Sequence, residues 1–289
     1  MKLMLKMNLV MIIVFLLGLA ASYAAANRLL KRNALVEIEN NARIMMESAL
    51  AVRTYTSKQI DPLLKTQMRY QFLPQSVPSY SATEYFNNLR GHFPDYAYKE
   101  ATLNPTNPRD RPSDWEVDVV NHFRQNSDAQ EVIGERDTPT GRTLYLARPL
   151  RIVDEACLEC HSSVEAAPQT LKDKYGTSNG FGWMLKDVVG AQIVSVPYEL
   201  PVKLADDALR GFMYLLVGLF LCMFLAANLL LTFLVVRPVR NLASIADQVS
   251  MGNMEAPEFR AKGSDEIGAL GASFNRMRRS LDEALKMLQ

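Results

Sequence analysis

The residues with the clearest chemistry in this chain stand together in the segment Cys157-Leu158-Glu159-Cys160-His161. The spacing Cys-x-x-Cys-His is that of a covalent attachment site for c-type haem. In such a site two thiols add across the haem vinyl groups, and the adjacent imidazole becomes the proximal iron ligand. The chain has only three Cys and three His, so half of these residues lie within five positions. The segment predicts one covalently bound haem c, anchored by Cys157 and Cys160, with His161 on the metal.

Other chemistry for the same residues is less well supported by the sequence. A structural zinc site takes four ligands, usually from two pairs, whereas Cys222 lies in an apolar run and His92 and His122 are far apart. A thioredoxin-like dithiol needs a Cys-x-x-Cys at the start of a helix after a strand, and residues 143–153 could supply that strand. A structural disulfide across so short a loop removes little chain entropy. Haem attachment is therefore favoured.

Two uncharged apolar segments are long enough to cross a bilayer, which takes about 20 apolar residues. They cover residues 7–26 and 211–236, and the second is bounded by Arg210 and Arg237. The first segment, preceded by lysines, is also compatible with a cleaved signal peptide, but its apolar core exceeds the usual length of about 7–15 residues. We expect an uncleaved anchor and a two-pass protein whose termini lie on the same side of the membrane.

The haem motif indicates the orientation, because c-type haem is attached outside the cytoplasm. Counting Lys and Arg does not decide it, since that rule loses force for loops beyond about 60 residues. We expect a bacterial inner-membrane protein embedded in lipid, with residues 27–210 in the periplasm and residues 1–6 and 237–289 in the cytoplasm. The formal net charge of +1 gives no indication of nucleic-acid binding.

Residues 27–210 indicate an α+β domain that begins with a long stalk helix. Residues 143–153 and 190–197 carry the apolar, β-branched patterns of strands, and the helix is expected to end near Pro62 and Pro74. A stalk helix followed by mixed elements predicts a PAS- or Cache-like sensor fold. The stalk has apolar positions at steps of three and four, facing either a dimer partner or the domain core: Leu35, Ile38, Ala42, Met45, Ala49 and Val52.

Residues 237–289 predict two helices joined by a connector. Pro238 follows directly on the second span, and Leu242, Ile245 and Val249 then recur at helical spacing. Residues 252–263 are expected to be non-helical, and a second helix opens at 264–266, where acidic residues suit a positive helix N-terminus. Its apolar positions form a heptad seam, which needs a partner helix: Ile267, Leu270, Phe274, Met277, Leu281, Ala284 and Leu288.

This hairpin resembles a HAMP signal-relay domain, whose two local markers match Pro238 and the segment Asp265-Glu266-Ile267-Gly268. The resemblance implies a parallel four-helix bundle made by two chains, hence a homodimer. A short amphipathic tail lying on the membrane is the alternative. No His follows His161, so we expect no histidine kinase in this polypeptide. Too few residues follow the hairpin for an output module, and we expect a cytoplasmic signalling partner in trans or a longer form of the chain.

Four further segments accompany the haem motif: Asn104-Pro105-Thr106-Asn107-Pro108, Trp115-Glu116, Tyr175-Gly176 and Gly180-Phe181-Gly182-Trp183. Together with the motif they resemble the c-type haem PAS-like sensor family, long labelled a domain of unknown function and often found before HAMP domains. The resemblance covers roughly residues 35–200, and it implies that Cys157 and Cys160 anchor the haem and that His161 is proximal.

The distal side of the haem departs from that family. Some members supply a Cys from the first helix as the sixth ligand, and Arg53 stands at the matching position here. The periplasmic segment has no other Cys, so thiolate ligation is excluded. An open or water-filled sixth position would let Arg53 hydrogen-bond a bound ligand. The side chains that could ligate instead are Met45, Met46, Met68, Tyr55, His92 and His122.

Three classes of function are compatible with these features. A membrane-bound haem sensor would convert a redox change or the binding of a diatomic gas into a movement of the second span, and the HAMP domain would relay it. A membrane-anchored electron-transfer cytochrome is the alternative, although a HAMP-like module has no use in it. An enzyme is the third class, but no general acid–base pair or second metal site is evident. The sequence favours the sensor.

Overall fold

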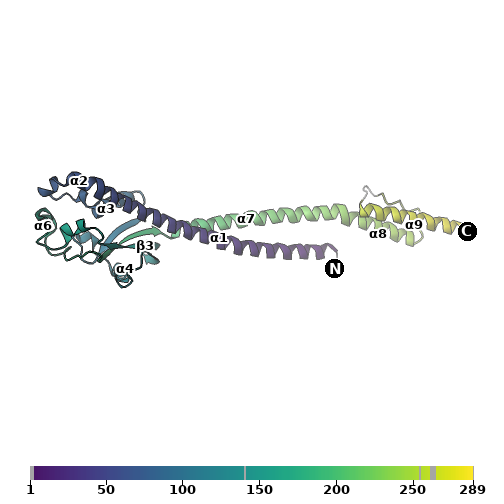
Figure 1. The fold of residues 1–289 in the computed structure, drawn as a ribbon. Helices are drawn as coiled ribbons and strands as arrows, with labels where there is room; N and C mark the ends of the chain where they lie inside the picture. Colours follow the sequence, from purple (N-terminus) through teal and green to yellow (C-terminus); the bar gives the residue numbers. More distant parts are fainter. Residues whose placement is uncertain (1–2, 140, 254, 261–264, 289) are drawn as a thin grey trace. The chain divides into compact units, whose positions relative to one another are not determined.

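The computed structural model describes residues 3–139, 141–253, 255–260 and 265–288. The chain divides into two compact units, which are described separately (Figure 1). The α+β unit is Ala26–Leu209, and the helical unit combines Met1–Ala25 with Arg210–Gln289. Two helices run through the boundaries between the units, α1 (Leu3–Tyr55) and α7 (Glu199–Leu230).

A four-stranded antiparallel sheet with the strand order β1-β4-β3-β2 forms the centre of the α+β unit. The predicted strands at 143–153 and 190–197 are confirmed as β3 (Gly141–Arg151) and β4 (Val188–Pro197). The sequence analysis missed β1 (Ala97–Thr102) and β2 (Val132–Thr138), which are the two edge strands. Both contain charged residues, so neither shows a continuous apolar pattern; Glu100 of β1 is nevertheless buried, whereas Glu135 and Asp137 of β2 are exposed.

Each inner strand sends alternate side chains to opposite faces of the sheet. Leu146 of β3 and Val194 of β4 pack in the cluster that includes α1 and α3 (Pro78–Arg90). Their neighbours Ala147 and Ile193 pack in a second cluster with α4 (Asp114–Gln125). The sheet is therefore covered by α1 and α3 on one face and by α4 on the other.

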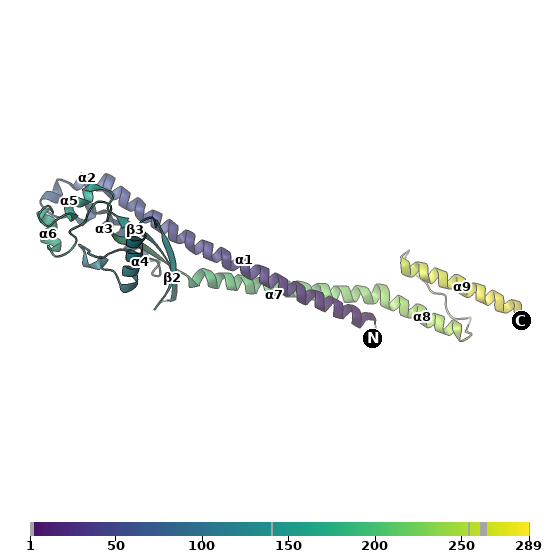
Figure 2. The same ribbon diagram turned by 60° about the horizontal axis from the view of Figure 1, so that its bottom comes forward.

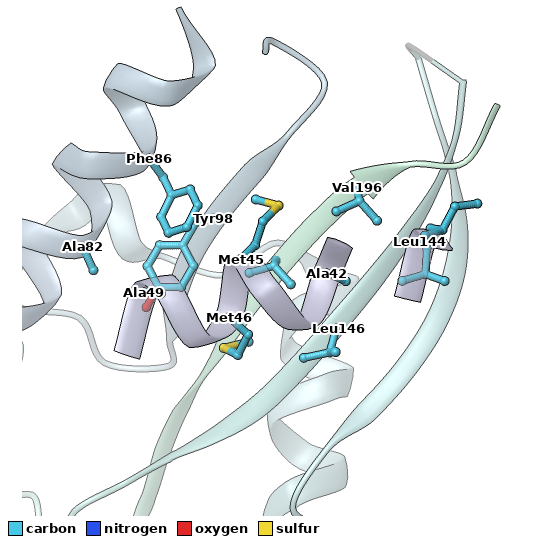
Figure 3. Close-up of a cluster of buried hydrophobic side chains, with 12 residues drawn as sticks. Ala42, Met45, Met46, Ala49, Ala82, Phe86, Tyr98, Leu144, Leu146 and Val196 are labelled. Atoms are coloured by element: carbon cyan, nitrogen blue, oxygen red, sulfur yellow. The ribbon is translucent and has the colours of Figure 1, made fainter. Parts of the chain in front are cut away.

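Helix α1 continues from the first apolar segment and packs into the core of the α+β unit. Ile38, Ala42, Met46 and Ala49 of α1 are almost completely buried, and they lie against the sheet together with Phe86 of α3 (Figure 3). The sequence left two partners open for the apolar seam of the stalk helix, a second copy of the chain or the core of its own domain. From Ile38 to Ala49 the seam packs into the domain core. The result confirms an α+β domain with a long N-terminal helix; its finer assignment as PAS- or Cache-like stays a prediction.

The long helix ends close to the predicted proline. A π-helical turn at Thr56–Ile60 leads into the short α2 (Asp61–Leu64), which contains Pro62. The 3-10 turns Gln67–Arg69 and Pro74–Ser76 follow before α3 begins. Proline lacks an N–H group and its ring clashes with the preceding turn, so the wider π-helical turn and the break that follows are expected there.

The helical unit contains the two apolar segments. The windows that are long and apolar enough to cross a membrane lie in the helical stretches Met4–Leu64 and Glu199–Ser250. The rings of Phe15 and Phe220 stack with their centroids 4.9 Å apart, so the segments contact each other within this unit. These segments agree with the predicted spans 7–26 and 211–236.

The second apolar segment leads into the predicted hairpin without a break. α7 is followed by a π-helical turn at Leu231–Val236 and by α8 (Arg237–Ser250), with Pro238 in its first turn. α9 (Glu266–Leu288) points in the same direction as α8 (Figure 2). The carboxylate of Asp265 accepts the N–H of Gly268 at 2.8 Å and so caps α9; Ser264, the first residue of the predicted helix start, lies outside the described residues.

The connector is fixed to the hairpin at Phe259. The side-chain amide of Asn275 donates to the Phe259 carbonyl at 2.8 Å and accepts its N–H at 3.1 Å. The Phe259 ring packs in the hairpin core with Ile245 and Val249. Other seam positions of α9 lie open in the single chain, where the side chains of Leu270, Met277 and Leu281 are exposed.

Candidate haem-binding site

The haem motif forms a single tight turn after β3. Cys157 closes a 3-10 turn (Glu155–Cys157) and Cys160 lies in the four-residue helix α5 (Leu158–His161). The carboxylate of Asp154 starts this turn by accepting the N–H of Ala156 at 2.9 Å. Because residues three apart share one side of a helical turn, the turn places the two thiols on one side. Both thiols are free and half-buried.

The protein environment does not activate these thiols as nucleophiles. Burial and the Asp154 carboxylate raise the pKa of Cys157, an effect that the positive charge of Arg53 partly opposes. Burial, followed by the charges of Glu159 and Asp61, raises the pKa of Cys160. Dithiols that perform thiol exchange have lowered pKa values. The thioredoxin-like alternative therefore finds no support in this site.

The imidazole of His161 is held in the form that binds a metal. Its Nδ1 lies 2.7 Å from the carbonyl oxygen of Gly180, and a carbonyl can only accept, so Nδ1 carries the proton. Burial, only partly opposed by this hydrogen bond, lowers the pKa of His161 and favours the neutral ring. Such a bond to a backbone carbonyl leaves Nε2 with its lone pair available. Among the described residues, no hydrogen bond engages Nε2.

A ring contact fixes the plane of the same imidazole. Trp183 stacks on His161 with the centroids 3.9 Å apart and the planes 16° from parallel. The backbone holds the two segments together, because the N–H of Trp183 donates to the His161 carbonyl and that of Gly182 to the Ser162 carbonyl, both at 3.1 Å. The hydrogen bond and the stacked ring together define the direction in which Nε2 points.

The carbonyl that receives His161 is itself positioned by a second loop. The side chain of Asn104 accepts the N–H of Gly180 and donates to the carbonyl of Phe181, both at 3.1 Å. Gly180 has a φ of +87°, and a Cβ there would lie 2.0 Å from the Oγ1 of Thr106. Only glycine meets both conditions. The same Thr106 hydroxyl lies 3.4 Å from Nδ1 of His161.

An apolar wall adjoins the thiol of Cys160. The side chains of Phe72, Ala167 and Leu171 form a buried cluster, and Cys160 and Phe181 pack against it. Leu171 belongs to α6 (Gln169–Tyr175), which follows the haem motif. Two free thiols, an oriented neutral imidazole and an apolar wall fit the needs of a covalently attached haem. Cys157, Cys160 and His161 are the residues that would hold it.

Arg53 lies in a buried ion pair. One of its guanidinium nitrogens, Nη1, is 2.5 Å from both carboxylate oxygens of Glu100, whose side chain is only 2% exposed. The hydroxyl of Tyr98 donates to the same carboxylate at 2.6 Å and accepts from the amide of Gln192 at 3.3 Å. Burial opposes the charge of Arg53, but the charges of Glu100 and Tyr98 and the hydrogen bond to Glu100 together outweigh burial and raise the pKa of the guanidinium. Arg53 is thus a fixed cation whose charge acts on Cys157.

The other distal candidates lie in different surroundings. Met45 and Met46 pack in the core cluster of α1 and the sheet. Met68 lies in the apolar wall beside Cys160, although its sulfur accepts the N–H of Leu73 at 3.0 Å. Tyr55 is half exposed near the end of α1. The last two candidates, the exposed His92 after α3 and His122 on α4, lie outside the contacts described for the motif.

Sequence reasoning missed several residues that build the site. Gly180 acts through its backbone carbonyl, which no pattern of side chains reveals, and the role of Asn104 depends on a contact across 76 residues. Glu100 and Tyr98 lie in β1, an edge strand that the hydropathy pattern did not indicate. In the sequence, the Asn-Pro and Gly-rich segments indicate a family resemblance, but they do not indicate that these residues position His161.

Comparison with known proteins identifies both parts of the chain. The family model described as Tll0287-like matches residues 31–197, more than half of the chain, and the HAMP domain model matches residues 230–283. The chain therefore belongs to the Tll0287-like family and carries a HAMP domain after it, which confirms the resemblance drawn from the sequence.

The solved structures include one similar chain, described as the crystal structure of the cyanobacterial heme-protein Tll0287. It is 17% identical, with a TM-score of 0.44, and the likeness covers 56% of this chain and 95% of that one. No curated protein matches the chain.

Proposed function

We propose that this protein is a membrane-bound c-type haem sensor that passes a change at the haem to a cytoplasmic partner through its HAMP domain. The observation that carries the proposal is the geometry at His161, where Nδ1 is bound to Gly180 and Nε2 is left for iron beside two free thiols. Family membership supports it, because the family takes its name from a protein described as a heme-protein. A haem bound here would supply a reversible ferric–ferrous change and an axial position open to exchange.

Attachment requires only the two thiols of the motif. Cys157 and Cys160 would hold the haem through thioether bonds, in which each Sγ–H would have added across one vinyl group and given its proton to the other vinyl carbon. This addition needs no oxidant or reductant. Because Cys157 and Cys160 share one turn with His161, attachment would hold the iron beside Nε2. Asn104, Gly180 and Trp183, which fix the imidazole, would then hold His161 as the iron ligand.

On the distal side, we place Arg53, whose positive charge acts on Cys157. The guanidinium of Arg53 is paired with Glu100 rather than free. It would hydrogen-bond a bound ligand while the Glu100 carboxylate continues to balance its charge. Met68, in the apolar wall beside Cys160, is the alternative: it could ligate if its sulfur exchanged the Leu73 N–H for iron.

The elements next to the site offer a route out of the domain. β4 is hydrogen-bonded to both β1 and β3, and α7 begins two residues after it. The carboxylate of Glu199, the first residue of α7, accepts the N–H of Arg142 at 3.2 Å and so joins the helix to β3. The helical stretch then continues to Ser250, inside the HAMP domain. A shift of the sheet would thus reach the HAMP domain along continuous backbone.

The proposal includes a topology and an assembly. Residues 27–210 would lie in the periplasm, where c-type haem is attached, and the HAMP domain in the cytoplasm of a two-pass inner-membrane protein. The exposed seam side chains Leu270, Met277 and Leu281 would meet those of a second copy in a homodimeric four-helix bundle. The chain would act as a transducer without catalytic activity of its own, and a signalling protein in trans would carry the output.

Spectra of the purified full-length protein test the cofactor. We expect haem that stays with the polypeptide after denaturation, and a reduced spectrum that changes with carbon monoxide or nitric oxide if the sixth position is open. Replacing both Cys157 and Cys160 with Ala should leave no covalent haem, whereas Cys222→Ser should leave its yield unchanged. Absence of covalent haem in the native sequence would refute the cofactor assignment.

Distances within the dimer test the signalling step. A spin label attached to Ser280→Cys, an exposed position of α9, in a Cys222→Ser background would report the separation of the two α9 helices. We expect the distance distribution to differ between the ferric, ferrous and gas-bound protein. Identical distributions in all three states, with covalent haem present, would leave an electron-transfer cytochrome as the better description.

A further inference from the structure

A cavity of about 360 Å³ lies away from the haem motif in the α+β unit. Its lining comes from β1, β4 and β2, from α3 and α4, and from the 3-10 turn Pro108–Asp110. Ile193 of β4, which packs on the α4 side of the sheet, forms part of the floor. Neither Cys157, Cys160 nor His161 contributes to it. Cavities of this size commonly accept small molecules.

The lining carries an excess of positive charge. It contains four cations, Arg90, Lys99, Arg109 and Arg136, against two carboxylates, Asp110 and Glu116, which gives a formal net charge of +2. A cavity with fixed charge of one sign attracts ions of the other sign. The expected ligand is therefore an anion.

Two of these cations are already neutralised by protein carboxylates. Lys99 pairs with Glu116 at 2.7 Å, and Glu116 also accepts the backbone N–H of Ser113 at 2.7 Å. Arg109 lies 3.5 Å from Asp110 and 2.7 Å from Glu84. The described part of the chain offers no carboxylate within ion-pair distance of Arg90 or Arg136. These two guanidinium groups supply the unbalanced charge.

Arg136 is the better fixed of the two. Its guanidinium lies over the ring of Trp115, 4.0 Å from the centroid, and Trp115 in turn packs on Tyr145 at 5.2 Å. Arg136 is half-buried, whereas Arg90 is exposed at the end of α3. A guanidinium stacked on an aromatic face keeps its planar fork of N–H donors, which matches a carboxylate in two parallel hydrogen bonds.

We propose that this cavity is a binding site for a small organic carboxylate, with Arg136 as its principal anchor. The planar fork favours a planar carboxylate, and the ring of Trp115 and the side chain of Ile193 offer apolar surface for the rest of the molecule. Asp110 and Glu116 in the lining would repel a multiply charged anion such as phosphate. The hydroxyl of Ser195 and the amide of Asn87, also in the lining, are available to polar substituents.

Calorimetric titration of the full-length protein in detergent micelles tests the proposal. The probes are the monoanions acetate, pyruvate, propionate and benzoate, each compared with its neutral amide and with inorganic phosphate. We expect at least one carboxylate to bind at one site per chain, the corresponding amide not to bind, and phosphate to bind more weakly. Arg136→Gln should weaken the carboxylate at least tenfold.

Arg142→Gln is the matched control, because Arg142 also stacks on an aromatic ring, that of Tyr198, and pairs with Glu135, but lies outside the cavity. It should leave the affinity unchanged. If Arg136→Gln does not fold, Arg90→Gln serves instead, with a smaller expected loss. Failure of all four carboxylates to bind, tighter binding of phosphate, or equal loss in the Arg142 variant would overturn the proposal. None of these outcomes bears on haem attachment.

Discussion

Replacing Glu100 by Leu is expected to destabilise the α+β unit strongly, because it removes the partner of a buried cation. The Glu100 side chain is 2% exposed and that of Arg53 is 23% exposed. Removing one partner of a buried ion pair costs about 3–5 kcal/mol, since the other charge is left uncompensated. Arg53 retains some contact with water, so we expect the lower end, about 3 kcal/mol.

The double variant Arg53→Met with Glu100→Leu separates the ion pair from packing. It leaves neither charge behind, and apolar pairs of similar volume often replace buried ion pairs without loss. We expect it to unfold with a free energy within about 1 kcal/mol of the native protein, so the two single changes should be far from additive. Tyr98 still accepts the amide of Gln192 in this variant, and its own O–H loses the Glu100 acceptor in the single and the double variant alike.

Urea titration of the full-length protein in micelles, followed by tryptophan fluorescence, provides the measurement. The chain has two Trp residues, Trp115 and Trp183, and both lie in the α+β unit, so the signal reports that unit alone. Glu135→Leu is the control, because its pair with Arg142 is largely exposed and such pairs contribute about 1 kcal/mol or less. A loss below about 1 kcal/mol for Glu100→Leu, or additive single changes, would refute the reasoning.

Three further predictions concern other parts of the chain. Gly180→Ala should lower the yield of covalent haem and shift its absorption bands, because the new Cβ would lie 2.0 Å from a threonine hydroxyl; Gly182→Ala has a similar φ of +80° but open space, so equal spectra for both would contradict this. Burial, partly opposed by Arg109, raises the pKa of Asp110 to about 6 from an ordinary 3.8, so the folded state binds a proton more tightly than the unfolded state between these values. The free energy of unfolding should therefore fall as pH rises from about 4 to about 6, by at most about 1.4 kcal/mol per pH unit. Urea titrations across this range should show that Asp110→Asn removes this contribution to the pH dependence. If the variant keeps the same dependence of unfolding free energy on pH, the assignment to Asp110 is wrong. Asn275→Ala removes both hydrogen bonds to the Phe259 backbone, so hydrogen exchange at that amide should accelerate while exchange in the α+β unit stays the same; unaltered protection would show that packing alone holds the connector.

The sequence was sufficient for features that depend on neighbouring residues. The haem motif is contiguous, and each apolar span is one unbroken run. The inner strands β3 and β4 are rich in apolar residues on both faces, because both of their faces are covered. The HAMP hairpin follows from helical periodicity and from the acidic start of α9. In each case the physical cause, helix or strand periodicity or thiol spacing, acts over a few residues.

The tertiary structure decided features that depend on distant residues or on the backbone. The stalk seam was compatible with a dimer partner or with the domain core, and packing against the sheet selected the core for Ile38 to Ala49. Arg53 meets Glu100 across 47 residues, on an edge strand whose polar sequence gives no strong period. His161 receives its orientation from the Gly180 carbonyl, a group that every residue type possesses. The sequence thus names the atoms that could bind haem, but only the fold brings together the backbone groups and charges that direct them.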